Sequence, residues 1–308
     1  MAVTRVVIDT DPGVDDAVAI LLALASPEID VLALTTVAGN VSLAATTLNA
    51  RRLVELAGRP DVVVAAGSDA ALTGPIDRHG GVHGHDGLGD LAWDEPAVGL
   101  DVDDGPDVVW RLLDEGPVAL VAIGPLTNLA VLLERHPEAA HRVERVVVMG
   151  GASFEGNVTP AAEFNVWADP EAAARVFAAA WPLTIMPLDL THQATLNDAD
   201  LAFFRGLGTE VGRRVADMLE PYAAFHDRWY GSRDLFMHDA MAVYELLDPT
   251  AIAKQGVAVA VETGGEHSRG ATWFDRRRAH EHSSVRVGLS LDNARFVALL
   301  RERLATYA

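Results

Sequence analysis

The sequence predicts an α/β fold with an open, mainly parallel central β-sheet flanked by helices. Short, uniformly apolar runs rich in valine and isoleucine recur along the chain, and such runs suit strands that are covered on both faces. Segments with helical periodicity lie between them, and this alternation predicts right-handed βαβ crossovers. The chain shows no internal repeat and no low-complexity linker, so we expect a single domain that spans residues 1–308.

The expected strands and helices alternate in chain order. Strands are expected at 5–9, 31–37, 62–67, 118–124, 145–151 and 183–189. Helices are expected from Val14 onward, over 43–56 with an end at Gly58 and Pro60, over 126–133 and over 171–177. A later apolar-periodic helix begins near His238 and Asp239.

Polar clusters follow the predicted strands at the point where each strand ends. These clusters lie at 9–16, 39–40, 67–68, 124–128 and 150–157. In an open parallel sheet, ligands bind beyond the carboxyl ends of the strands, which share one edge of the sheet. The clusters therefore predict one site, built from segments that are far apart in the sequence.

The composition excludes several classes of function. Lys and Arg number 24 against 44 Asp and Glu, a formal net charge of −20, so we expect no nucleic-acid and no membrane partner. The chain has no cysteine, which excludes disulfides, thiolate zinc sites and cysteine nucleophiles. No secretory signal is visible, and the longest apolar run, at 17–25, is too short to span a bilayer. We therefore expect a cytoplasmic protein.

The first predicted turn, within IDTDPGVDDAVAI at 8–20, carries four aspartates: Asp9, Asp11, Asp15 and Asp16. Asp15 and Asp16 fall in the first helical turn, where the helix N-terminus stabilises carboxylates, and Asp9 could be a strand-end hydrogen-bond acceptor. The whole set is harder to explain in this way. Carboxylates about 4 Å apart repel by about 4 kcal/mol at an effective dielectric of 20, and no lysine or arginine occurs from position 6 to 50. We therefore predict a bound hard dication, Ca²⁺ or Mg²⁺, and several carboxylates with neutral oxygens favour Ca²⁺.

Other clusters could add to this site. Asp239 stands at a predicted helix start, where an aspartate is an N-cap far more often than a ligand. In VAIGPLTNLA at 121–130, Thr127 could offer its backbone carbonyl or cap the following helix. The segment 156–173 supplies further polar partners, namely Asn157, Glu163 and Asn165.

Seven motifs occur in order along the chain. They are IDTDPGVDDAVAI at 8–20, TTVAGN at 35–40, VHGHDGLG at 82–89, GPLTNLA at 124–130, VVMGGA at 147–152, AEFNVWADPEAA at 162–173 and MHDAMAVY at 237–244. Together they resemble the inosine-uridine-type nucleoside hydrolases, and the DTDPGxDDA opening is highly specific. The resemblance implies that family's Rossmann-like fold and an enzyme that splits ribonucleosides into ribose and free base.

The resemblance also implies a tightly held Ca²⁺. By motif position, Asp11, Asp16, the Thr127 carbonyl and Asp239 look like its ligands, and the ion would also bind a water and two ribose hydroxyls. Asp11 is the expected general base for that water. His238 is similar in position to the family histidine proposed to protonate the leaving base. Direct attack by water implies inversion at the anomeric carbon.

The same resemblance implies a set of substrate contacts. These are Asp15, Asn40, His83, Met149, Asn157, Glu163, Phe164, Asn165, Tyr222 and His226. Tyr222 and His226 belong to 220–236, where the family is expected to place its base-facing loop and helix. Arg228, Trp229 and Tyr230 are further candidates there, although aromatic residues at such spacing are more often ordinary packing.

The base preference expected from the motifs is broad or pyrimidine-leaning. Some family members hold a purine between tryptophans, whereas His83 stands in the VHG motif of this chain. Family members are often dimers or tetramers, so we expect a homodimer or homotetramer.

Two other functions match part of the pattern. A phosphohydrolase of the haloacid dehalogenase type also places D-x-D after its first strand, but it needs a downstream lysine. Lys254 is the one lysine of the chain and lies in no matching motif. A non-catalytic nucleoside-binding protein on the same scaffold remains an alternative, although the full set of expected residues argues for activity.

Overall fold

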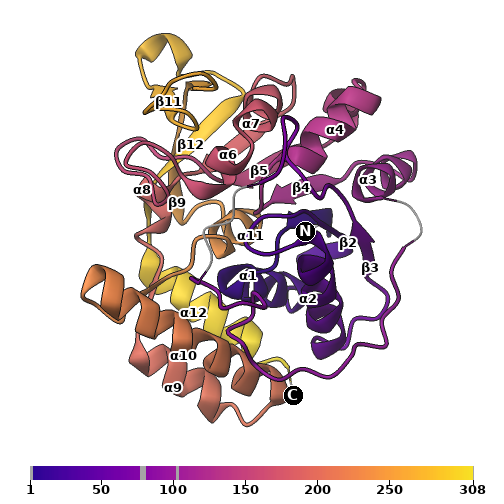
Figure 1. Ribbon diagram of the computed structural model, residues 1–308, viewed down its shortest axis with the longest axis vertical. Coiled ribbons are helices and arrows are strands. Elements are labelled where there is room, and N and C mark those ends of the chain that lie inside the picture. Colours follow the sequence, from indigo (N-terminus) through magenta and orange to yellow (C-terminus); the bar gives the residue numbers. More distant parts are fainter. Residues whose placement is uncertain (1–2, 77–80, 102–103, 308) are drawn as a thin grey trace.

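Eight strands form the central sheet in the computed structural model, which describes residues 3–76, 81–101 and 104–307. Their order across the sheet is β3-β2-β1-β4-β5-β6-β12-β9 (Figure 1). The strands are β1 (Thr4–Thr10), β2 (Ile29–Thr36), β3 (Val63–Ala66), β4 (Ala119–Ala122), β5 (Arg145–Met149), β6 (Leu183–Met186), β9 (Ile252–Gly256) and β12 (Val285–Leu291). Neighbours pair in parallel except β9, which is antiparallel to β12. The predicted open, mainly parallel sheet is confirmed.

The chain order across the sheet reverses beside β1. β2 and β3 extend to one side of β1, whereas β4, β5 and β6 extend to the other. Asp9 near the carboxyl end of β1 pairs with Ala122 at the carboxyl end of β4. Ligands of doubly wound sheets bind outside the carboxyl ends at such a reversal, so the sheet places the binding position where the polar clusters of the sequence converge.

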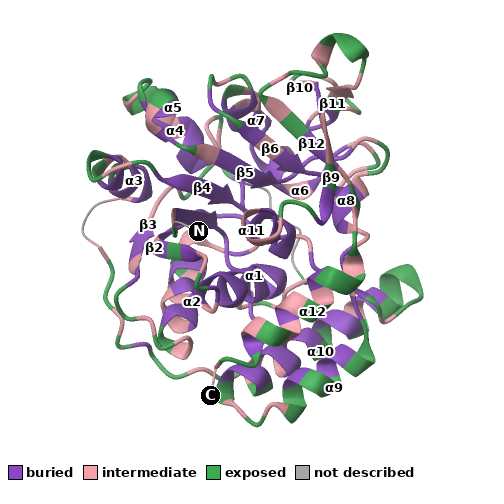
Figure 2. Cartoon of the chain, turned by 180° about the vertical axis from the view of Figure 1, so that it is seen from behind, coloured by how far each residue is buried: buried purple, intermediate pink, exposed green. Residues whose placement is uncertain are grey.

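Helices cover both faces of the sheet. They are α1 (Val14–Leu24), α2 (Leu43–Leu56), α3 (Gly105–Asp114), α4 (Thr127–Arg135), α5 (Ala139–Arg142), α6 (Phe164–Ala168), α7 (Pro170–Phe177), α8 (Leu188–Thr191), α9 (Asp198–Gly206), α10 (Glu210–Tyr230), α11 (Ala240–Leu247) and α12 (Asn293–Leu304). Alternate residues of β1 point to opposite faces: Val6 and Ile8 join the core under α1, α10, α11 and α12, and Val7 joins the core under α3, α4 and α7. Figure 2 shows the buried sheet and α1 enclosed by helices with exposed outer faces.

Local sequence explains where the first helices begin and end. Pro12 and Gly13 form the turn after β1, and α1 starts at Val14 with the Asp16 carboxylate accepting the Gly13 N–H at 2.9 Å. All eleven residues of α1 are buried, its two aspartates included. The helix α2 ends before Gly58, whose φ of 67° lies in the left-handed region that glycine tolerates. These boundaries agree with the predicted ones.

Smaller elements complete the fold. Two-stranded antiparallel sheets are formed by β7 (Thr195–Leu196) with β8 (Leu235–Phe236) and by β10 (Ala258–Val261) with β11 (Thr272–Asp275), and a 3₁₀ turn, η1, spans Arg278–His280. The β10–β11 hairpin and the pair α9–α10 lie at opposite ends of the molecule (Figure 1). Within the described part of the chain, no helix combines the length and apolarity needed to cross a membrane.

Candidate active site

A cavity of about 370 Å³, here called the active-site cavity, opens where β1, β4 and β5 end. Its lining includes all ten residues that the sequence predicts to contact substrate, together with His238 and Asp239. The other predicted ligands, Asp11, Asp16 and Thr127, are buried and do not line it. The remaining lining residues are Gly81, Val82, Gly84, Ile123, Val158, Phe225, Trp229 and Tyr230.

Three buried carboxylates come together at one end of the cavity. One oxygen each of Asp15, Asp16 and Asp239 lies within 4.8 Å of the other two. Burial, reinforced by the negative charge of Asp16, raises the pKa of Asp15 to about 8. Burial and the neighbouring aspartates raise the pKa of Asp239 well above its ordinary range. A bound cation would favour the ionised forms, so these three residues could hold a metal ion.

Asp11 lies beside this cluster in a close-fitting backbone cradle. Its Oδ2 accepts the Asn40 N–H at 2.7 Å, and its Oδ1 is buried without a hydrogen-bond partner among the described residues. A Cβ at Gly39 would lie 2.0 Å from Oδ2, and a Cβ at Gly124 would lie 2.6 Å from Oδ1. Burial, followed by the charge of Asp16, raises the pKa of Asp11 well above its ordinary value. The result is a basic carboxylate with one unengaged oxygen.

Asp16 and Asn40 connect the first turn to the loop after β2. Asp16 Oδ1 accepts the Thr10 hydroxyl at 2.6 Å, and its Oδ2 accepts the Asn40 side-chain amide at 3.1 Å. The same Asn40 amide group donates to the Asp11 carbonyl at 3.1 Å. The helix-start role predicted as an alternative for Asp16 is also present, because its carboxylate accepts the Gly13 N–H at the start of α1, and this role coexists with membership of the carboxylate cluster. Asn40 keeps its side-chain carbonyl for a ligand in the cavity.

Asp239 stands at the N-cap position of α11, but its side chain makes no capping hydrogen bond. It joins the carboxylate cluster instead, so the capping alternative does not account for it. Thr127 is the first residue of α4 and does not cap that helix, because the cap position is Leu126. The Thr127 hydroxyl donates to Asp169 at 2.8 Å.

Glu163 forms part of the cavity wall. Its Oε1 accepts the Asn165 N–H at 2.7 Å, and its Oε2 accepts the N–H groups of Gly151 at 2.8 Å and Val166 at 3.1 Å. It thereby caps α6 with a side chain that is 1% exposed. Burial outweighs these hydrogen bonds and raises the pKa of Glu163 to about 7. A sugar in the cavity would meet a carboxyl group held rigidly by the backbone.

Two asparagines extend this wall. The Asn165 side-chain amide donates to the carbonyls of Ile123 at 3.0 Å and Met149 at 3.2 Å, which follow or end β4 and β5. Asn157 accepts the Phe164 N–H at 2.9 Å. One polar group of each asparagine side chain is thus hydrogen-bonded to the backbone, and the other is available to bind a ligand.

Histidine and tyrosine rings form a row along the cavity that begins beside the carboxylates, because His83 Nδ1 lies 3.8 Å from Asp15 Oδ1. His83 Nδ1 accepts the Val14 N–H at 3.2 Å, and burial lowers the pKa of His83 to about 4. The His83 ring stacks on Tyr222 with centroids 5.6 Å apart, and Tyr222 meets His226 edge-on at 4.6 Å. His226 Nδ1 lies 2.8 Å from the Asp234 carbonyl, so this nitrogen carries a hydrogen. The rings form one continuous row.

His238 lines the cavity near this row. Its Nδ1 lies 2.7 Å from the Thr191 hydroxyl. Burial, followed by the neighbouring His192, lowers the pKa of His238 well below its ordinary value. His192, which the sequence assigns no role, lies edge-on to His238 at 5.5 Å but does not line the cavity.

The rim of the cavity at this end is aromatic and exposed. Trp229 is 70% exposed and Tyr230 is 47% exposed. Phe225 stacks on Trp229 with centroids 5.9 Å apart. Arg228, the remaining candidate of this segment, does not line the cavity.

Some site residues escape the sequence motifs. Ile123, Val158 and Phe225 line the cavity, and each is next to a residue that the sequence analysis does identify, namely Gly124, Asn157 and His226. Thr191 follows the sixth predicted strand within LDLTH, so its position after a strand was the available signal. Asp9, by contrast, is a strand-end acceptor for Thr35 and Asn128, as its alternative interpretation predicts.

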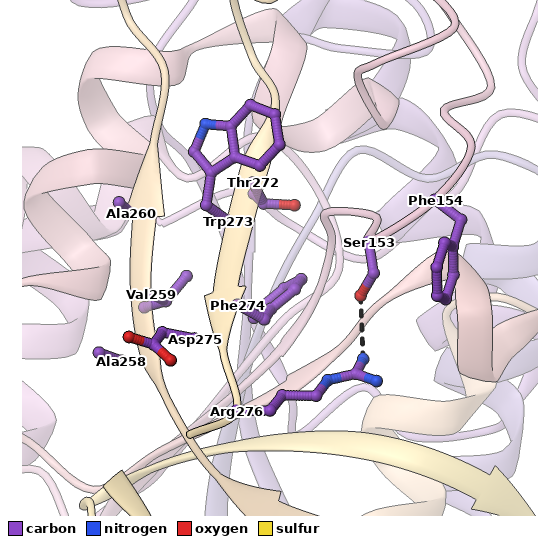
Figure 3. Close-up of a pocket in the computed structure, with 10 residues that line it drawn as sticks. All are labelled: Ser153, Phe154, Ala258, Val259, Ala260, Thr272, Trp273, Phe274, Asp275 and Arg276. Carbon is purple, nitrogen blue, oxygen red and sulfur yellow. Dashed lines mark hydrogen bonds between the residues drawn. The ribbon is translucent and has the colours of Figure 1, made fainter. Parts of the chain in front are cut away.

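A second cavity, of about 570 Å³, lies between the β10–β11 sheet and the segment Ser153–Phe154 (Figure 3). Its charged residues are Asp275 and Arg276, and Arg276 donates to the Ser153 hydroxyl at 3.0 Å (Figure 3). Phe154 is 85% exposed and Trp273 is 57% exposed. This cavity is larger than the active-site cavity but has neither its carboxylate cluster nor its histidines. The chemistry therefore resides in the smaller one.

Comparisons with known proteins agree with this geometry. Residues 6–298 match the family model described as inosine-uridine preferring nucleoside hydrolase. A curated relative, the pyrimidine-specific ribonucleoside hydrolase RihA of Shewanella woodyi, is 39% identical over 98% of each chain. Among solved structures, the plant nucleoside hydrolase PpNRh1 superposes with a TM-score of 0.93 at 35% identity over 98% of this chain and 99% of that one. A purine-preferring ribonucleoside hydrolase from Gardnerella vaginalis also gives 0.93, at 30% identity over 99% of each.

Sequence and structural relatives are thus enzymes of one class, the ribonucleoside hydrolases, which act on N-glycosyl bonds. This chain belongs to the inosine-uridine preferring nucleoside hydrolase family. The resemblance drawn from the seven motifs is confirmed, and the haloacid dehalogenase alternative is excluded.

Proposed function

We propose that this enzyme cleaves ribonucleosides by direct attack of water, with Asp11 as general base and Ca²⁺ as cofactor. The observation that carries this proposal is that one cavity joins a cluster of buried carboxylates to His238. Cleavage of a ribosyl bond builds positive charge on the sugar and negative charge on the departing base. A cavity that contains both buried carboxylates and a hydrogen donor suits both charges.

The residues at the carboxylate end fit a hard dication. Asp15, Asp16 and Asp239 offer converging oxygens, and Asp11 adds a buried oxygen without a partner. An all-oxygen set favours Ca²⁺ over transition metals. We propose that Asp11, Asp16, Asp239 and the Thr127 carbonyl hold the ion. When bound, it would orient the water and the ribose diol and lower the pKa of the water.

The protein's own groups account for the proton movements. Asp11 accepts the proton of the attacking water at Oδ1, because its Oδ2 is engaged by the Asn40 N–H. Asp15 and Glu163 stabilise the positive charge that develops on the sugar. His238 supplies a hydrogen to the departing base, which makes it a better leaving group.

Release of reducing sugar from inosine and uridine tests this function, with Asp11→Ala as the control. We expect release by the native enzyme and none by the variant. No release from any ribonucleoside by the calcium-loaded native protein would instead indicate a non-catalytic nucleoside binder. Undiminished release by Asp11→Ala would refute the role of Asp11.

We propose a base preference that is broad or pyrimidine-leaning. The support is the pyrimidine-specific relative at 39% identity and the presence of His83 rather than a tryptophan at the cavity wall. Values of kcat/KM for uridine, cytidine, inosine and guanosine decide it. Higher values for both purines than for both pyrimidines would contradict the proposal.

We also propose that the enzyme is a homodimer or homotetramer, since closed symmetric assemblies are the commonest among soluble proteins. The formal charge of −20 opposes association only weakly at physiological salt. Sedimentation velocity at micromolar concentration measures the assembly. A monomer there would contradict this part of the proposal.

A further inference from the structure

Thr191 is a buried residue outside the cavity lining whose hydroxyl reaches His238. Thr191 is 0% exposed, and its Oγ1 lies 2.7 Å from His238 Nδ1. This is its one side-chain hydrogen bond within the described residues. The preceding carbonyl that a helical threonine often contacts, that of Pro187, accepts the N–H groups of Leu190 and Thr191.

The direction of this hydrogen bond follows from counting donors and acceptors. A buried hydroxyl hydrogen needs an acceptor, and His238 Nδ1 is the acceptor within reach. If Nδ1 carried a hydrogen and donated it, the hydroxyl hydrogen of Thr191 would be left buried without a partner. Donation from Thr191 to Nδ1 satisfies both groups. A neutral imidazole has one N–H, so the hydrogen of His238 is then on Nε2.

We propose that Thr191 is a positioning residue that fixes His238 in the Nε2–H tautomer, so that Nε2 presents its hydrogen to the departing base. His238 lines the active-site cavity, and Nε2 has no hydrogen-bond partner among the residues that the structure describes. The step is donation of a hydrogen bond to the base nitrogen as the C1′–N bond lengthens. This inference rests on the proposed role of His238.

The backbone holds Thr191 and His238 in fixed relation. Thr195 pairs with Phe236 in the β7–β8 sheet, and the Met237 N–H donates to the Ala194 carbonyl at 2.9 Å. At the other end of α8, the Leu188 N–H donates to the Gly151 carbonyl at 2.9 Å. The Thr191 hydroxyl and the His238 imidazole are therefore brought together by two short segments that are hydrogen-bonded to each other. A tautomer set by rigid neighbours needs no reorganisation during the reaction.

Three variants test the proposal on two substrates. Thr191→Val removes the hydroxyl and keeps the shape, Thr191→Ser keeps the hydroxyl, and His238→Ala removes the ring. Uridine has a poor leaving group, whereas p-nitrophenyl riboside has an activated one that needs no hydrogen donor. We expect Thr191→Val to lower kcat for uridine about tenfold and to leave the nitrophenyl substrate and KM nearly unchanged. Thr191→Ser should behave like the native enzyme on both substrates.

A spectroscopic readout reports the tautomer without turnover. Long-range ¹H–¹⁵N correlation spectra, with His238→Ala for assignment, should show the Nε2–H form in the native enzyme and in Thr191→Ser. They should show a mixture in Thr191→Val. The Nδ1–H form in the native enzyme, or equal slowing of both substrates by Thr191→Val, would overturn the proposal. If His238→Ala itself slows both substrates equally, the role of His238 fails instead, which is a separate outcome.

Discussion

The two ends of the active-site cavity are built differently. At the carboxylate end, Asp11, Asp16 and Glu163 are buried and bonded to backbone N–H groups, and glycines fit closely around Asp11. At the ring end, Trp229 and Tyr230 are largely exposed, and contacts are mostly between aromatic faces and edges. Rigid, desolvated groups can stabilise the charge that develops in a transition state, whereas exposed aromatic rings can pack against nucleobases of different shape. The comparison teaches that turnover should depend on the carboxylate end and on the buried His238, and that substrate preference should depend on the exposed rings.

Removal of the metal should have the largest effect, because it acts on the whole carboxylate end. A chelator should abolish turnover, and Ca²⁺ should restore it. Without a cation, burial and the charge of Asp16 raise the pKa of Asp15 from its ordinary value of 3.8 to about 8. The contribution of this carboxyl group to folding stability is then fully present below pH 3.8 and is lost as pH rises through about 8. The increase in Tm on adding Ca²⁺ should therefore be larger at pH 8 than at pH 5. An equal or larger increase at pH 5 would contradict the site.

The variant Asp11→Asn tests the proposed general base, because it replaces one carboxylate oxygen of the carboxylate end by an amide nitrogen. We expect turnover to fall roughly 10²–10⁴-fold on every nucleoside, because an amide cannot take the proton of water. Metal affinity, measured by titration calorimetry, should be largely retained. The matched control is Asp9→Asn, because Asp9 is a nearby buried carboxyl in β1 whose pKa burial raises to about 7, but its carboxylate accepts hydrogen bonds from Thr35 and Asn128 instead of lying beside the carboxylate cluster. Its turnover loss should be much smaller; equal losses would remove the special role of Asp11.

The variant Glu163→Gln tests whether the Glu163 carboxyl group is desolvated, by measuring how the free energy of unfolding depends on pH. Burial raises the pKa of Glu163 from 4.5 to about 7, so its contribution is present below pH 4.5 and is lost as pH rises through about 7. Glutamine has no such dependence. The deficit in the free energy of unfolding of Glu163→Gln should therefore shrink between pH 5 and pH 8, by at most about 3 kcal/mol. Urea titrations at the two pH values measure it, and a deficit that grows with pH would show that Glu163 is not desolvated.

Trp229→Ala probes the ring end and should have the smallest effect. Loss of an exposed stacking surface should raise KM for nucleosides roughly 2- to 10-fold and leave kcat nearly unchanged. Trp273→Ala is the matched control, because Trp273 is also exposed and lines the second cavity. A similar change in both variants, or a large loss of kcat in Trp229→Ala, would break the proposed division between the two ends.

Much of the site could be predicted because its signals are local. The turn at Pro12 and Gly13 follows a strand of apolar residues, so the sequence places Asp11, Asp15 and Asp16 together without any distant contact. Motif positions then supply residues such as Met149 and Asn165, which line the cavity. The pairing of Thr191 with His238, 47 residues apart, and of Thr127 with Asp169, 42 residues apart, has no comparable signal. These contacts depend on how separate segments pack.

The sequence by itself determined the alternation of strands and helices and the acidic first turn, because hydrophobic period and turn chemistry act over a few neighbouring residues. Only the tertiary structure decided which carboxylates converge. It turns Asp9 toward Thr35 and Asn128, and it brings Asp239 to Asp15 and Asp16 from more than two hundred residues away. The physical reason is that convergence is set by strand order and by the packing of α1 against α11, and neither is encoded in any one segment.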